Sequence, residues 1–165
     1  MELIPIFNKE LDYEAEVTRK MLSRVPEDKF DWKPHEKSMS MKVLAGHIAE
    51  LPSWIAMGLQ TDEMDFEANP YQPPALSSSQ DLLELFEKSL REGRAALANA
   101  SEADMLPTWT LRAGAQVYMQ LQKHEVIRHS LNQITHHRAQ LGVYLRLLNI
   151  PIPGSYGPSA DEADM

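Results

Sequence analysis

The sequence predicts an all-α protein, and three observations favour this class. Apolar residues recur at the three- and four-residue spacing of helices along most of the chain, and no two segments alternate convincingly as paired strands would. Serines precede two of these apolar runs, as N-cap residues do. Two longer connections separate the runs, so the simplest architecture is a four-helix bundle. We expect residues 1–165 to form a single domain with a short irregular C-terminal tail.

The first two helices are expected on either side of an aromatic and charged loop. The first helix ends before Pro26 and carries its apolar stripe at Ile4, Phe7, Leu11, Ala15, Thr18 and Leu22. The second begins near Ser38 or Ser40 and continues to about Gly58. Pro52 lies inside this helix and removes one backbone hydrogen bond, which predicts a kink.

The second half of the chain predicts two more helices. Residues 61–77 contain three prolines and little periodicity, so we expect a loop there. The helix that follows has serine caps and an apolar stripe through Leu82, Phe86, Leu90 and Leu97. Residues 105–116 are expected to be extended and loop-like. The longest helix is predicted from about Tyr118 to Leu148 and is closed by Pro151.

Composition narrows the range of functions. A net charge of −8 disfavours binding to nucleic acid, because contacts with phosphates rely on clustered Lys and Arg. No apolar run approaches the roughly 20 residues that cross a bilayer, so no membrane partner is expected. The absence of cysteine excludes disulfides, a thiolate nucleophile and cysteine-based zinc sites. The acidic, patterned start of the chain is unlike a secretory signal, and we expect a cytoplasmic location.

Two histidines are predicted to face the inside of the bundle from different helices. At about 100° per residue, His47 falls in the middle of the apolar stripe of the second helix, and His137 in that of the last helix. Gln133 lies one turn before His137 on the same inner face, whereas His136 points about 100° away, to the flank. Burial of these polar groups is costly unless each finds a partner.

These positions predict either a metal or polar-ligand site or a buried hydrogen-bond network. Residues four apart on a helix lie about 6 Å apart along its axis, so Gln133 and His137 can reach one ion. Glu50 follows His47 at a spacing that can place a carboxylate beside a metal-bound water, although a surface glutamate is the simpler interpretation. The HEVIRH segment is not a zinc-protease helix, because its histidines are five residues apart instead of four.

Several segments resemble the DinB-like family of metal-binding four-helix bundles, and the likeness extends over nearly the whole chain. These segments are LAGHIAELPSW, LNQITHHRAQLGVYLRLL, FDWKPHEKSMSM and IPIPGSYGPSADE. The family's metal site takes one histidine from the second helix and an H-x-x-x-H pair from the last. His47 and His137 match the first and last of these ligands, and Gln133 replaces the middle histidine. Arg138 and Gln140 match polar residues that follow the last histidine, and the resemblance also implies a homodimer.

Two function hypotheses follow. In the first, the protein is an enzyme in which His47, Gln133 and His137 hold a divalent metal, Zn²⁺ or Ni²⁺, and Glu50 is the candidate catalytic residue. The resemblance implies an S-transferase that uses a low-molecular-weight thiol, or a metal-dependent hydrolase. In the second, the protein binds metal or a small ligand weakly and catalyses nothing, because an amide oxygen is a poorer ligand for these ions than imidazole. Both hypotheses imply a small-molecule partner.

Overall fold

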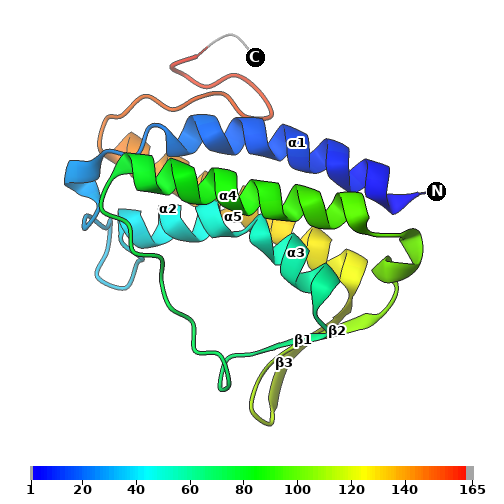
Figure 1. Ribbon diagram of the computed structural model, residues 1–165. Coiled ribbons are helices and arrows are strands. Elements are labelled where there is room, and N and C mark those ends of the chain that lie inside the picture. Colours follow the sequence, from blue (N-terminus) through cyan, green and yellow to red (C-terminus); the bar gives the residue numbers. More distant parts are fainter. Residues whose placement is uncertain (1, 163–165) are drawn as a thin grey trace.

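The computed structural model describes residues 2–162 and has the architecture of a helical bundle whose second helix is broken (Figure 1). Its α-helices are α1 (Leu3–Leu22), α2 (Met41–Glu50), α3 (Ser53–Gln60), α4 (Ser79–Asn99) and α5 (Lys123–Leu147). Two short 3₁₀ segments, η1 (Glu27–Lys29) and η2 (Glu102–Met105), lie in the connections. No helix within residues 2–162 has an apolar stretch long enough to cross a membrane.

The core lies between the long helices, where the predicted apolar stripes meet. Buried side chains of α1 include Phe7, Leu11 and Leu22, and all four predicted positions of α4 are fully buried: Leu82, Phe86, Leu90 and Leu97. α5 contributes Ile134 and Leu141 to the same cluster. The helical periodicity therefore identified the inward faces of these helices correctly.

The predicted kink at Pro52 is a complete break between α2 and α3. The Ser40 hydroxyl caps the start of α2 by accepting a hydrogen bond from the Val43 N–H. At the other end, the buried hydroxyl of Ser130 in α5 donates to the Leu51 carbonyl over 2.7 Å. Because proline cannot donate a backbone hydrogen bond, the helix ends here, and this contact satisfies a carbonyl at the break.

α4 approaches this break very closely, and a glycine makes the approach possible. A Cβ atom at Gly93 would lie 2.6 Å from the Pro52 carbonyl oxygen and 3.6 Å from Cβ of Ile55. No real side chain tolerates the first of these distances, so any larger residue must push α4 away from the α2–α3 junction. Gly93 thus sets the distance between these helices.

A three-stranded sheet at one end of the bundle corrects the all-α prediction (Figure 1). It consists of β1 (Glu63–Asp65), β2 (Thr108–Ala113) and β3 (Gln116–Gln122), with β1 parallel and β3 antiparallel to β2. The last helix consequently begins at Lys123 and not near Tyr118. Its first predicted residues instead pair with β2, where the fully buried Trp109 lies opposite Leu121. So short a segment carries too little periodicity to separate a strand from a helix.

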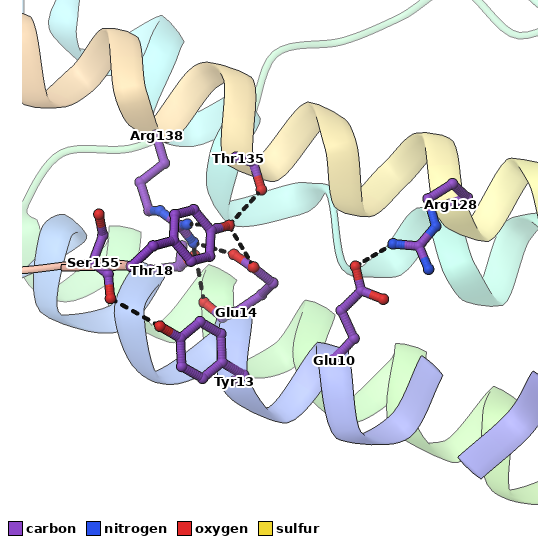
Figure 2. A network of polar contacts seen from close by, with 9 residues as sticks. Glu10, Tyr13, Glu14, Thr18, Arg128, Thr135, Arg138 and Ser155 are labelled. Carbon is purple, nitrogen blue, oxygen red and sulfur yellow. Dashed lines mark hydrogen bonds and ion pairs between the residues drawn. The ribbon is translucent and has the colours of Figure 1, made fainter. Parts of the chain in front are cut away.

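A buried ion pair joins α1 to α5 (Figure 2). The side chains of Arg138 and Glu14 are only 3% and 6% exposed, and Arg138 Nη1 lies 2.5 Å from Glu14 Oε2. Arg138 also donates to the Thr18 hydroxyl over 3.0 Å. The Tyr156 hydroxyl accepts from Arg138 and donates to Glu14 Oε1, while Thr135 lies 3.0 Å from the same hydroxyl. Each polar group of the pair thereby has a partner.

The C-terminal segment, predicted as a short irregular tail, is held against the bundle as far as residue 162. Tyr13 of α1 donates its hydroxyl hydrogen to the Ser155 carbonyl over 2.9 Å (Figure 2). Asp161 forms an ion pair with Arg146 of α5, and Glu162 forms one with Arg24. The remaining predicted tail, residues 163–165, lies outside the described part of the chain.

We predict that Gly93→Ala destabilises the protein, although alanine favours helix formation over glycine by about 1 kcal/mol. Overpacking against the Pro52 carbonyl costs about 1–3 kcal/mol, which leaves an expected net loss of up to about 2 kcal/mol. Urea denaturation measures this loss. Glu92→Ala, at an exposed position one residue earlier in α4, is the matched control and should change stability by less than about 0.5 kcal/mol. A more stable Gly93→Ala variant would contradict the close contact.

We also predict that Arg138→Met destabilises the protein by about 3–5 kcal/mol, because it leaves the Glu14 carboxylate buried without its cation. The control is Arg128→Met, which removes a more exposed ion pair with Glu10 between the same two helices (Figure 2). That pair should contribute about 0–1 kcal/mol. Equal losses of unfolding free energy in the two variants would show that burial of Arg138 has no special consequence.

Candidate functional site

The imidazole rings of His47 and His137 meet where α2 faces α5. Their centroids are 4.8 Å apart and their planes cross at 76°. Both residues are half-buried, and the His47 side chain is 26% exposed. The prediction that both face the space between the helices therefore holds, but they lie at the edge of the core and not at its centre. Solvent and small ligands can reach this edge.

Both rings are oriented through their Nδ1 atoms by oxygen acceptors. His47 Nδ1 lies 2.9 Å from Glu50 Oε1, and His137 Nδ1 lies 2.9 Å from Oε1 of Gln140. An ionised carboxylate and an amide oxygen can only accept, so Nδ1 must donate in each case. In the neutral form of each ring, Nε2 then keeps its lone pair. Metal-binding histidines commonly have this arrangement, in which a second group fixes the tautomer and the ring orientation.

Burial keeps His137 neutral. Desolvation lowers the pKa of His137 below its usual value, and the neighbouring His47 and His136 lower it further, against an opposing effect of the hydrogen bond to Gln140. A neutral imidazole can bind a metal ion or accept a proton, whereas the protonated form can do neither. His137 is thus in the chemically useful form near neutral pH.

Glu50 is held by two donors at once. Its Oε1 accepts from His47 and also from the Tyr71 hydroxyl, which lies 2.7 Å away. Burial and the adjacent carboxylate raise the pKa of Tyr71 well above its usual value, so this hydroxyl stays protonated and remains a donor. The spacing of Glu50 and His47 predicted their proximity. Tyr71 was not identified, because the contact joins α2 to a loop and leaves no local signal.

A pocket of about 500 Å³ opens beside His47 and Glu50. The rest of its lining is contributed by α3 and by the segment that follows β1, through Trp54, Phe66, Pro70 and Tyr71. Most of this lining is therefore aromatic or apolar. His137 and Gln133 are not among the lining residues, so the pocket lies on the Glu50 side of His47.

The third expected metal ligand, Gln133, lies half-buried on α5 one turn before His137. Within residues 2–162, no three His, Cys, Asp or Glu side chains are grouped so that they could hold a metal ion. A metal at this site would consequently need the Gln133 amide oxygen, or water, to complete its coordination. His136 is exposed, as predicted for the flank, and its ring packs against that of His137 at 4.8 Å.

The two residues matched to polar positions of the DinB-like family have different roles in this structure. Gln140 orients the imidazole of His137, and Arg138 forms the buried ion pair with Glu14. One signal for the ion pair was present in the sequence, since Glu14 and Thr18 lie four residues apart on one face of α1. The sequence does not reveal which residue of another helix they meet.

Comparison with known proteins shows which family the chain resembles. The family model described as "DinB family" matches residues 7–164. The uncharacterized protein YrdA of Bacillus subtilis (strain 168) is 22% identical over 162 residues, which cover 94% of this chain and 89% of YrdA.

Solved structures show the same fold. A DinB-like protein of Bacillus subtilis, YjoA, superposes with a TM-score of 0.70 at 17% identity and covers 90% of this chain and 96% of its own. A DinB-like protein of Bacillus cereus ATCC 10987 also gives 0.70, at 20% identity, with coverages of 91% and 95%. The chain thus has a DinB-like fold and belongs to the DinB family.

Proposed function

We propose that the protein is a metal-dependent enzyme in which His47 and His137 bind a divalent ion, Zn²⁺ or Ni²⁺. The observation that carries the proposal is the pairing of two imidazoles, 4.8 Å apart, whose Nδ1 atoms are both engaged by acceptors. Their Nε2 lone pairs are the donors that such ions prefer. Gln133 completes the site as a weak third ligand, and the remaining positions are open to water or substrate.

The proposed reaction is the transfer of a low-molecular-weight thiol to an electrophile, or a hydrolysis. A divalent ion at this site would lower the pKa of a bound thiol or water and so supply the nucleophile. Since the chain has no cysteine, the thiol must come from a small molecule. Glu50 holds His47 in its orientation through the hydrogen bond to Nδ1, and this is the role we propose for it in the reaction.

A second candidate is a protein that binds metal or a small ligand weakly and has no catalytic activity. It is favoured by the amide at Gln133 and by the lack of a three-residue His, Cys, Asp or Glu cluster among residues 2–162. Thiol consumption separates the two candidates. Metal-loaded protein should consume low-molecular-weight thiols in the presence of 1-chloro-2,4-dinitrobenzene if it is a transferase, and the activity should disappear on chelation.

We predict that His47→Ala removes bound metal, because one of two imidazole ligands is lost. Elemental analysis of protein purified without a histidine tag measures the metal content. His136→Ala is the matched control, since that exposed side chain lies beside His137 without facing α2, and it should leave the metal content unchanged. Unchanged metal in His47→Ala would place the ion elsewhere.

The weak third ligand, Gln133, leads to a separate prediction. Gln133→His should tighten binding of Zn²⁺ or Ni²⁺ at least about tenfold, which corresponds to about 1.4 kcal/mol, because imidazole is a stronger ligand than an amide oxygen. Isothermal titration of metal-free wild type and variant measures the difference, and circular dichroism confirms that the variant is folded. Equal affinities in folded protein would mean that residue 133 does not face the ion.

A further inference from the structure

The lining of the pocket beside His47 combines several aromatic side chains with a single carboxylate. Three of its lining residues are aromatic, namely Trp54, Phe66 and Tyr71, and one is Pro70. Its only acidic member is Glu50, and no Lys or Arg belongs to the lining. The whole chain also carries a net charge of −8. Apart from His47, the lining contains no side chain that can carry a positive charge, and the Glu50 carboxylate repels carboxylates and phosphates.

We propose that this pocket binds an alkylated ammonium group, such as the trimethylammonium end of a small-molecule substrate. Aromatic faces attract organic cations through their quadrupoles, and an adjacent carboxylate adds direct charge attraction. A methylated ammonium is also too weakly hydrated and too apolar at its surface to be favoured by a purely carboxylate site. The aromatic lining suits the apolar surface of a methylated ammonium, and the Glu50 carboxylate suits its positive charge.

The position of Glu50 supports this assignment. Its Oε1 is occupied by His47 Nδ1 and the Tyr71 hydroxyl, which fix the carboxylate in place at the pocket wall. The carboxylate is 17% exposed, so it is partly desolvated but still accessible. Such a fixed, partly desolvated charge attracts a cation more strongly than a mobile surface glutamate does.

The ammonium position is separate from the proposed metal. The pocket lies on the Nδ1 side of His47, whereas the metal would bind at Nε2 and at His137, which does not line the pocket. The inference deepens the proposed function by naming the substrate class, and it rests on that function only in placing the reacting group near His47. Ammonium binding itself requires no metal.

Choline and its neutral isostere 3,3-dimethyl-1-butanol test the proposal, because they share shape and differ in charge. Isothermal titration of full-length, EDTA-treated protein at constant ionic strength should give at least about tenfold tighter binding for choline. Equal or tighter binding of the alcohol would overturn the proposal in favour of a merely apolar pocket. Failure of both compounds to bind at tens of millimolar would overturn it as well. Because metal is absent, neither result depends on the metal site.

Two variants test whether choline binds in this pocket. Glu50→Gln should weaken choline binding at least about tenfold and leave binding of the alcohol unchanged, whereas Phe66→Leu should weaken choline binding with Glu50 intact. The matched control is Glu84→Gln, which removes an exposed carboxylate of α4 outside this pocket and should change neither affinity. Undiminished choline binding by folded Glu50→Gln and Phe66→Leu would overturn the proposal.

Discussion

The buried ion pair between Arg138 and Glu14 sets the rotation of α5 about its own axis, and the geometry of the site depends on that rotation. A charged pair with this little exposure is stable only when both groups are held in place by further hydrogen bonds, here one that Arg138 donates to Thr18 and one that Tyr156 donates to Glu14. Adjacent helix residues point about 100° apart, so fixing Arg138 towards α1 also turns His137 towards α2. The same pair anchors the C-terminal segment through Tyr156.

The break at Pro52 gives the other half of the site its shape. It ends α2 at Glu50, so His47 and Glu50 occupy the last turn of that helix, next to a change in chain direction. α3 then carries Trp54 to the wall of the pocket. The small residue at Gly93 lets α4 pack against the break itself.

The polar groups of the site have complementary roles that are assigned by their hydrogen-bonding capacities. Glu50 and Gln140 accept hydrogen bonds from Nδ1 of the two imidazoles and fix the orientation of both rings. Burial keeps His137 from gaining a proton, and the hydroxyl of Tyr71 keeps its own. The bundle therefore provides a preorganised pair of imidazoles beside a fixed carboxylate, which is the common basis of the proposed metal and ammonium sites.

Features encoded by local periodicity could be predicted from the sequence, because they depend on residues close together in the chain. The main helices, the buried stripe of α4, an interruption at Pro52 and the facing of His47 and His137 are all of this kind, although the structure has a complete break where a kink was predicted. The family resemblance was also correct, since its motifs are contiguous.

Contacts between distant segments were decided only by the tertiary structure. The strand β3 takes its conformation from pairing with β2, and its own residues are too few to specify it. Tyr71 contacts Glu50 from an irregular loop. Arg138 and Glu14 lie on two different helices and are 124 positions apart in the chain. Each pairing depends on how whole elements pack, which no local pattern specifies. The sequence thus determined which faces turn inward, and packing determined which residues meet there.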